Sequence, residues 1–484
     1  MSNNSTKNIK MLRGINKICG PRSFFMEPYV SSFQLSSHYS SAKPAANAQN
    51  LPRLPVPKLS DTLNKYLKTV KPHLKDEEFA ITSRLIQSFG AEGGVGQKLQ
   101  ALLEKRAQEH LNWLEEWWLL TAYLGYRDPV VVYSSPGLVF PFRKFNTQNE
   151  QLKYAAKTLL AALEYKSLID SDKIPTEMMG KNPLDMLQYK KIFGTCRIPG
   201  DKTDKLSFND SKYVTVIHNN HIFHVDLWGA DNVVLSEDQI VQQLKQVIEL
   251  SKTPTDNAIG VLTSENRDAW AKAYQLLTKD QVNRESLADI EKSIVVLCLD
   301  SAVGLWDNKD KNARQNIAAA QTIHGGGSRS NGSNRWFDKT VQVHLYVLKH
   351  CDLFIPYCIH QCICYFQALQ GFGVDRHLLG LKLIAKENGI DIPELYSDAG
   401  FVRSAHMRIS TSQVACKCDG FMCYGPLVPD GYATCYNPRD NDINFATSAF
   451  VSNPETACDK YRAALEQSLQ DMHDILLQNT KAKL

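Results

Sequence analysis

The sequence lacks several features that would each assign the chain to a familiar class. It has no run of 18 apolar residues, so no transmembrane helix is predicted. The net charge is only +4 over 484 residues, which does not suggest a nucleic-acid-binding protein. The 12 cysteines have no regular spacing and follow no secretory apolar segment, which favours free thiols in a reducing compartment. The length of 484 residues is enough for two or three ordinary domains or one large two-lobed unit, and the hydrophobic content of 43% is ordinary for a soluble globular protein.

Several catalytic and ligand-binding motifs are also missing. Neither Gly-x-Gly-x-x-Gly nor a Walker A sequence occurs, so the sequence indicates neither a Rossmann dinucleotide-binding fold nor a P-loop. The loop His324–Gly327 is similar to the oxyanion loop of lipases, but the Gly-x-Ser-x-Gly nucleophile elbow of that fold is absent. His218, His221 and His224 stand at three-residue steps in a predicted strand context, so they split across both faces. No carboxylate or cysteine completes a ligand set there, and we predict no metal site.

The two ends of the chain have the character of targeting signals. Residues 1–50 contain six basic residues, frequent serine and a single acid, Glu27, which is the composition of a mitochondrial transit peptide. A disordered tail is the alternative. The last residues, Ala482-Lys483-Leu484, resemble the peroxisomal Ser-Lys-Leu address. We therefore expect a mitochondrial protein, with peroxisomal localisation in addition.

The body of the chain alternates helical and strand patterns. Ser60 or Asp61 is expected to cap a helix with Leu63, Tyr66 and Leu67 on its apolar face. Apolar residues at three- and four-residue steps predict a helix over 97–125, and its tryptophans Trp113, Trp117 and Trp118 are expected to build core. Further along, we predict strands over 213–217, 221–225 and 293–299 and helices over 236–250, 283–292 and 454–480. This alternation favours a layered α/β architecture.

A hydroxyl-rich stretch, Ile409–Val414, is predicted to form a strand. Side chains alternate faces along a strand, so Ser410 and Ser412 point the same way and Thr411 points the other way. Two hydroxyls about 7 Å apart can donate to a negative oxygen in a cleft. The alternative is a strand rich in serine and threonine on a solvated face.

Motifs around this strand resemble one known family. The motifs are DRHLLGL at 375–381, STSQ at 410–413, GPLVPDGY at 425–432, GTCRIPG at 194–200 and RWFDK at 335–339. Together they resemble the carnitine/choline acyltransferase family. The resemblance implies an α/β fold with two lobes of mixed β-sheet flanked by helices, as in CoA-dependent acyltransferases, and a site between the lobes.

The resemblance also implies an activity and a set of site residues. The activity is reversible transfer of short acyl groups, such as acetyl, between CoA and carnitine, which are substrates, so no cofactor is expected. By resemblance, Arg376 pairs with the carnitine carboxylate, a task that suits a planar guanidinium. Ser410 contacts carnitine, Ser412 is the oxyanion donor and Gln413 lies against CoA. Met422 lies in the acyl pocket, where its bulk favours short groups; ordinary core filling is the alternative.

The family pattern breaks after Gln342. In the family, an Asp-Gly and a Glu-His or Asp-His pair follow, and this His is the general base. A Lys-Lys-x-x-Phe stretch that holds CoA phosphates comes next. Residues 343–374 contain none of these motifs. We predict that this stretch is a foreign insert, from splicing or an incorrect gene model, and that the chain is inactive without the base. Neither His324 nor His377 lies at the family's position.

The insert also contains a crowded set of possible zinc ligands, Cys358, His360, Cys362 and Cys364. One-residue spacers give these side chains an awkward geometry for zinc, so no zinc site is predicted.

These observations divide the chain into four parts. Residues 1–50 are a targeting segment, 51–342 the N-terminal part of the fold, 343–374 the insert, and 375–484 a C-terminal part whose lobe is incomplete. We expect exposed apolar surface on that lobe. The expected partners are carnitine and acyl-CoA, with no nucleic acid and a monomeric chain. A non-catalytic isoform that binds carnitine or CoA or acts as a scaffold is the main alternative, and a choline-acetylating enzyme is the weaker one.

Overall fold

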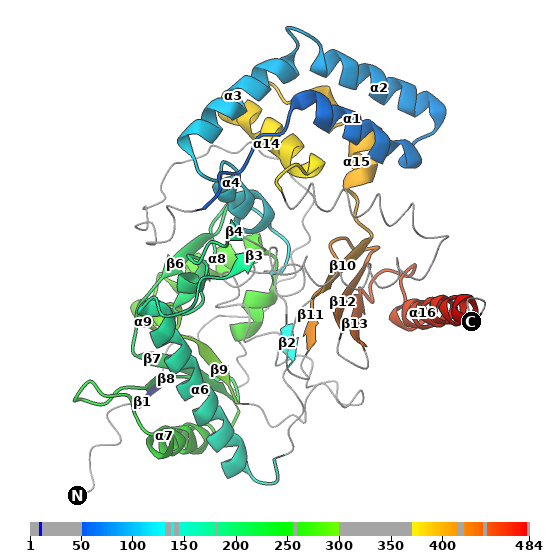
Figure 1. Cartoon of the computed structure of the whole chain (residues 1–484). Helices are drawn as coiled ribbons and strands as arrows, with labels where there is room; N and C mark the ends of the chain where they lie inside the picture. Colours follow the sequence, from blue (N-terminus) through cyan, green and yellow to red (C-terminus); the bar gives the residue numbers. More distant parts are fainter. Residues whose placement is uncertain are drawn as a thin grey trace, which may run out of the picture.

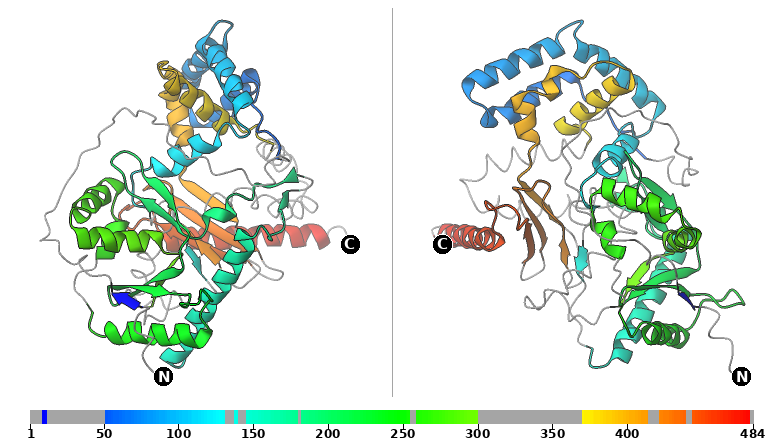
Figure 2. Two further views of the ribbon diagram at one scale, coloured as in Figure 1. Left: turned by 90° about the vertical axis from the view of Figure 1, so that its left-hand side faces the viewer. Right: turned by 180° about the vertical axis from the view of Figure 1, so that it is seen from behind.

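The computed structural model describes residues 9–11, 51–130, 137–139, 145–179, 182–254, 259–299, 370–413, 421–438 and 443–481. These residues form a helical body at one end of the molecule, a sheet flanked by helices at the other end, and a C-terminal sheet beside them (Figures 1 and 2). The mixture of helices with small mixed sheets confirms the predicted α/β class.

The helical body joins two distant parts of the sequence. From the N-terminal part come α1 (Leu59–Val70), η3 (Lys71–His73), α2 (Asp76–Gly90) and α3 (Val95–Glu109). From the C-terminal part come α14 (Val374–Glu387), η7 (Glu394–Tyr396) and α15 (Ala399–Ala405). Their apolar faces share one core, in which Leu103 and Leu381 are fully buried. The N-terminal helices are therefore held in place by the segment that carries Arg376.

The predicted first helix exists, but its predicted cap is wrong. The N-cap is Lys58, and Ser60 and Asp61 lie inside the first turn. The start is earlier because Leu59 is buried with Leu63 in the shared core. Placing Leu59 one turn before Leu63 on the same helix face stabilises the helix through packing, without a side-chain cap.

The helix predicted over 97–125 is interrupted. After α3, His110 is extended, and the helix resumes as α4 (Glu115–Leu119) and a π-helical turn, η4 (Leu120–Leu124). The Asn112 side chain accepts a hydrogen bond from the backbone N–H of Leu114 at 3.2 Å, which favours a turn over a continuous helix. Trp113 and Trp117 are buried in the core, as predicted, whereas Trp118 is half-buried.

The N-terminal sheet has the strand order β1-β8-β7-β9. Its strands are β1 (Ile9–Met11), β7 (Tyr213–His218), β8 (His221–Asp226) and β9 (Val296–Cys298), which confirms the three predicted strands. Two helices pack on it, α6 (Gln148–Asp170) and α7 (Glu237–Leu250). Helix α7 begins as predicted after Ser236, whose hydroxyl accepts a hydrogen bond from the Gln239 N–H in a capping box.

Smaller elements surround this sheet. Helices α8 (Arg267–Leu277) and α9 (Gln281–Lys292) pack beside the hairpin of β5 (Thr195–Ile198) and β6 (Lys205–Phe208). The remaining short elements are β3 (Met178–Met179), β4 (Asn182–Pro183), η5 (Tyr189–Lys191) and η6 (Ile259–Ser264). The helix predicted over 283–292 is therefore confirmed, two residues longer at its start.

The C-terminal sheet has the strand order β10-β12-β13, from β10 (Ile409–Gln413), β12 (Tyr432–Pro438) and β13 (Ile443–Ala449). Beside it, β11 (Phe421–Cys423) pairs with β2 (Gly137–Val139), which links the C-terminal sheet to the N-terminal part of the chain. The final helix, α16 (Cys458–Lys481), begins four residues later than predicted. Its apolar side chains Leu469, Met472 and Ile475 are exposed, in agreement with the expected apolar surface.

Candidate functional site

The two serines of β10 lie on one face, as predicted. Strand β10 pairs in parallel with β12, and the register places Ser410 opposite Ala433 and Ser412 opposite Cys435. Both serines are half-buried, whereas Thr411 between them is exposed. The half-buried face can therefore present two hydroxyl donors, an arrangement that suits a developing negative oxygen.

A buried tyrosine fixes the position of this strand. The Tyr424 hydroxyl lies 3.2 Å from the backbone oxygen of Ser410 and 3.1 Å from that of Thr434. Tyr424 belongs to a small core with Ala433 and Cys435. This hydroxyl connects β10 and β12 from the side, in addition to their ladder hydrogen bonds, so the backbone that carries Ser410 is held on two sides.

Gln413 and Met422 are placed only by strand pairing. Gln413 is the last residue of β10, opposite Tyr436. Met422 is the middle residue of β11, opposite Leu138 of β2. Their side chains lie outside the described part of the structure, so their roles toward CoA and in the acyl pocket stay predictions.

Arg376 lies in the first turn of α14 and stacks on an aromatic ring. Its guanidinium carbon is 3.6 Å from the ring centroid of Trp118 in α4. Stacking leaves the N–H groups at the edge of a guanidinium available for a carboxylate. Trp118 packs against the helical core, as predicted, and its contact with Arg376 was not predicted.

The structure keeps Arg376 and the serines on separate bodies. Arg376 belongs to the helical body, and Ser410 and Ser412 belong to the C-terminal sheet that follows α15 (Figure 1). Within the described residues, no hydrogen bond or ion pair joins Arg376 to β10. A substrate that contacts all three side chains would have to bridge these two bodies.

His377 is a structural residue of the helical core. It is fully buried, with Nδ1 2.7 Å from the Thr62 hydroxyl and Nε2 3.0 Å from Oε1 of Gln100. The Gln100 amide nitrogen donates to the backbone oxygen of Pro57, so Oε1 faces the ring and Nε2 carries the proton. Burial lowers the pKa of His377 to about 4. Such a ring has no access to substrate and does not serve as the base.

A second histidine, His406, lies near the start of β10 and was not singled out from the sequence. Its Nε2 is 2.9 Å from Oδ1 of Asp430, and Arg408 lies 3.1 Å from Oδ2 of the same carboxylate. The hydrogen bond from His406 lowers the pKa of Asp430. These contacts attach the GPLVPDGY motif to the residues that precede β10.

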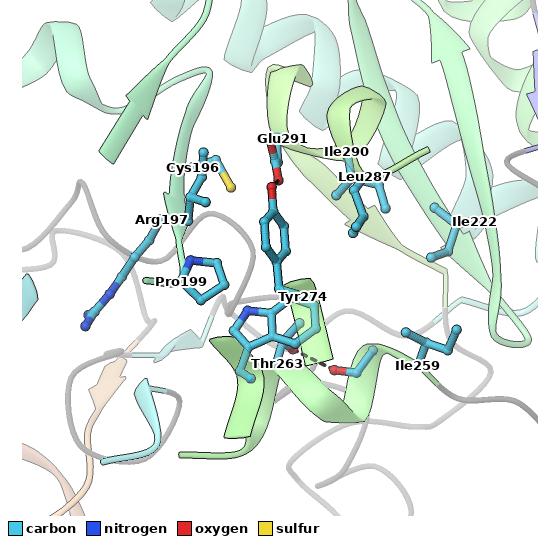
Figure 3. Close-up of a pocket in the computed structure, with 13 residues that line it drawn as sticks. Cys196, Arg197, Pro199, Ile222, Ile259, Thr263, Tyr274, Leu287, Ile290 and Glu291 are labelled. Atoms are coloured by element: carbon cyan, nitrogen blue, oxygen red, sulfur yellow. Dashed lines mark hydrogen bonds between the residues drawn. The ribbon is translucent and has the colours of Figure 1, made fainter. Parts of the chain in front are cut away.

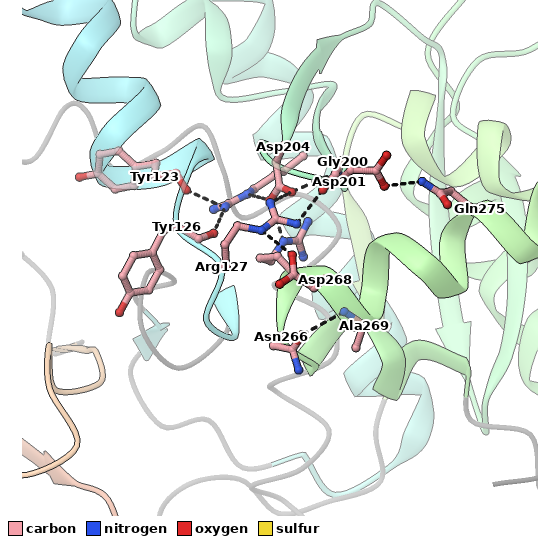
Figure 4. A network of polar contacts seen from close by, with 12 residues as sticks. Tyr123, Tyr126, Arg127, Gly200, Asp201, Asp204, Asn266, Asp268, Ala269 and Gln275 are labelled. Atoms are coloured by element: carbon pink, nitrogen blue, oxygen red, sulfur yellow. Dashed lines mark hydrogen bonds and ion pairs between the residues drawn. The ribbon is translucent and has the colours of Figure 1, made fainter. Parts of the chain in front are cut away.

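A buried ionic network holds the segment that follows Trp118 (Figure 4). Oδ2 of Asp204 accepts hydrogen bonds from Nε of Arg197 and Nε of Arg267, each at 2.6 Å. Oδ1 of Asp204 accepts one from Arg127 at 3.1 Å. Arg197 also donates to the backbone oxygen of Tyr123 at 2.7 Å. The network therefore ties residues 123–127 to the β5–β6 hairpin and to α8.

The three histidines of the N-terminal sheet do not converge. His218 contacts the Ser251 hydroxyl at 2.7 Å, His221 contacts the backbone oxygen of Thr253 at 2.9 Å, and His224 stacks on Tyr213. In the described part of the chain, no group of three or more His, Cys, Asp or Glu side chains is arranged to hold a metal ion. The cysteines of the 343–374 stretch lie outside the described residues.

No described helix has the length and apolarity needed to cross a membrane.

The described residues form an α/β fold whose β10 presents two half-buried serines on one face, and sequence comparison shows the family. The family profile described as Choline/Carnitine o-acyltransferase matches residues 54–355 and 357–467. The chain therefore belongs to this family. The two matched segments meet at residue 356, within the stretch 343–374.

Individual relatives agree with this assignment. The chain is 33% identical to the carnitine O-acetyltransferase of Columba livia over 617 aligned positions, which cover 92% of this chain and 98% of the relative. Identity to the carnitine O-acetyltransferase of Homo sapiens is 32%, with 95% and 98% covered. The choline O-acetyltransferase of Gallus gallus is 27% identical, with 88% and 92% covered. The 617 positions of the first alignment exceed the 484 residues of this chain.

Proposed function

We propose that this chain is a carnitine O-acetyltransferase that retains part of the site for short-acyl transfer between CoA and carnitine but lacks its general base. The observation that carries the proposal is the shared, half-buried face of Ser410 and Ser412 on β10. It matches the arrangement that acyl transfer requires of its oxyanion donor. The names of the most similar relatives support carnitine and acetyl-CoA as the substrates.

The proposed chemistry is direct transfer without an acyl-enzyme. A base removes the proton of the carnitine hydroxyl, and the oxygen attacks the thioester carbon while the CoA thiolate leaves and takes up a proton. Ser412 donates to the tetrahedral oxyanion, and the carnitine ammonium adds charge stabilisation. Positioning, proton transfer and oxyanion stabilisation are separate contributions, so one can be lost while the others persist.

The missing contribution is proton transfer. His377 is excluded as a substitute because it is buried and hydrogen-bonded on both ring nitrogens. Loss of a general base typically lowers the rate by about 10²- to 10⁴-fold. The excess of aligned positions over residues supports a missing block, and the split of the family match at residue 356 supports its location there. We attribute the block to alternative splicing or to an incorrect gene model.

Arg376 favours carnitine over choline. Carnitine carries a carboxylate that can pair with a guanidinium, and choline does not. The contact with the Trp118 ring restricts the Arg376 side chain, which reduces the rotamer freedom lost on binding. A non-catalytic isoform that only binds carnitine or CoA shares these contacts, so binding measurements and transfer assays are both needed.

Isothermal titration calorimetry with carnitine, choline and CoA tests the binding part of the proposal. We expect weak binding of carnitine that falls by about 10-fold or more in Arg376→Lys, which loses the bidentate geometry. Arg408→Lys, a change at another exposed arginine, is the matched control and is expected to bind like the wild type. Equal binding of carnitine and choline, or no effect of Arg376→Lys, would contradict the assignment of Arg376.

We also propose that residues 1–50 direct mitochondrial import and that the terminal Ala-Lys-Leu directs a fraction to peroxisomes. The basic, acid-poor composition of residues 1–50 supports the first address. Imaging of two fluorescent fusions, one with residues 1–50 and one with the last residues, tests the two addresses separately. A diffuse signal from both fusions would refute this proposal.

A further inference from the structure

A small cavity lies in the N-terminal part of the chain, apart from the site described above. It has a volume of about 50 Å³ and lies between β5, η6, α8 and α9, with one side chain from β8 (Figure 3). None of its lining residues belongs to β10 or α14. Most of its wall is apolar, formed by Pro199, Ile222, Ile259, Trp270, Leu287 and Ile290.

One carboxyl group, that of Glu291, interrupts this apolar wall. The Tyr274 hydroxyl donates a hydrogen bond to Oε1 of Glu291 at 2.6 Å. Within the described residues, no lysine or arginine nitrogen lies within 4.0 Å of this carboxyl group. Burial raises the pKa of Glu291, which reflects the cost of an unpaired charge at this place.

The neighbouring Lys292 offsets only part of the effect of burial on the pKa of Glu291, and no described cation forms an ion pair with its carboxyl group. Arg197 lines the cavity, but its guanidinium points away from it and is engaged with Asp204 (Figure 3). Burial also raises the pKa of the Cys196 thiol, which disfavours a second negative charge beside Glu291. The cavity therefore combines one acidic group with two aromatic rings, those of Trp270 and Tyr274, and its one lining arginine, Arg197, is paired with Asp204 instead of Glu291.

We infer that this cavity is a binding site for a small alkylammonium ion. A carboxyl group that lacks a cation forms a charge-assisted hydrogen bond with an ammonium group. Aromatic rings that line a desolvated pocket add cation–π attraction. One water molecule, which has a single non-hydrogen atom, needs about 10–15 Å³ of cavity volume. The cavity volume of about 50 Å³ therefore has room for about three to five non-hydrogen atoms. An ion of the size of ethylammonium fits this limit, and the inference does not depend on acyl transfer.

Saturation-transfer NMR with ethylammonium and ethanol tests the inference on the full chain. The two probes have the same number of non-hydrogen atoms and differ in charge. At matched ionic strength, we expect saturable binding of ethylammonium to the wild type and binding of ethanol that is at least about 10-fold weaker. Equal binding of the two probes would show a merely apolar cavity and overturn the inference.

Two variants and one control connect the binding to this cavity. Glu291→Gln keeps an acceptor for the Tyr274 hydroxyl but removes the charge, and it is expected to weaken ethylammonium binding at least about 10-fold. Ile222→Phe fills the cavity without touching Glu291 and is expected to abolish binding. Glu249→Gln removes a charge on the exposed surface of α7 and is expected to bind like the wild type. Unchanged binding in Glu291→Gln and Ile222→Phe would place the ion elsewhere.

Discussion

The Asp204 carboxylate is a shared counter-charge for Arg127, Arg197 and Arg267. Arg197 and Arg267 share its Oδ2, and these two side chains and that of Asp204 are buried. Replacing Asp204 by Asn leaves two buried guanidinium groups without a counter-charge. Removing one partner of a buried ion pair costs about 3–5 kcal/mol, so Asp204→Asn is expected to lower the free energy of unfolding by about that amount.

The matched control is Asp268, which contacts the same network from the surface. Its carboxylate accepts from Nε of Arg127 at 2.9 Å, and its side chain is 51% exposed. Exposed ion pairs contribute about 0–1 kcal/mol, so Asp268→Asn is expected to be nearly neutral. Urea unfolding of both variants provides the comparison. Equal losses would mean that the buried network does not depend on the Asp204 charge.

Because His377 is buried, the free energy of unfolding is expected to fall in acid. Its pKa in the folded chain is about 4, below the ordinary value of about 6.5 in the unfolded chain. As the pH falls from 6.5 toward 4, the unfolded chain binds a proton that the folded chain does not bind. The free energy of unfolding therefore decreases over this window, by up to about 3 kcal/mol.

The variant His377→Gln isolates this contribution, because it has no ring that titrates. Urea unfolding near pH 7 and near pH 4.5 measures the pH dependence of stability in both proteins. The wild type is expected to lose about 2–3 kcal/mol more than the variant between these two conditions. A parallel loss in the two proteins would mean that His377 is accessible and titrates normally.

At the scale of elements, the sequence predicted helices and strands better than their ends. Periodic apolar residues predicted α7, and the apolar ends and hydroxyl-rich middle of residues 409–414 predicted β10, because local pattern determines these elements. The break after Glu109 was missed, because an Asn112 side chain that bonds the backbone competes with the helix without changing the apolar period. The early start of α1 depends on the burial of Leu59, a tertiary effect.

The crossing of α14 over α3 depends on Gly380. A Cβ at this position would lie 2.6 Å from Cζ3 of Trp113 and 3.2 Å from Cδ2 of Leu103. Gly380→Ala is therefore expected to destabilise the chain by about 1–3 kcal/mol through overpacking. Gly260→Ala is the control, since a Cβ there has no neighbour within 4 Å, and a change within about 0.5 kcal/mol is expected. Thermal unfolding distinguishes the two, and a neutral Gly380→Ala would show that the helices separate easily.

At the scale of the whole molecule, the site depends on contacts between segments that are distant in sequence. The motifs predicted Arg376 and the β10 serines as site residues, and the shared face of Ser410 and Ser412 is confirmed. No local pattern could reveal that Trp118 supports Arg376, because helix packing brings α4 and α14 together. The cavity at Glu291 was missed for the same reason, since its wall comes from five separate elements.

The central claim is that this chain retains positioning residues without a general base. The most direct measurement is an acetyl-transfer assay of the purified full-length chain with acetyl-CoA and carnitine, beside an intact carnitine O-acetyltransferase. We predict a rate at least about 10²-fold below that of the intact enzyme, and a further loss in Ser412→Ala, because oxyanion stabilisation is separate from proton transfer. Transfer at a rate close to that of the intact enzyme would contradict the claim, because another group would then have to supply the base.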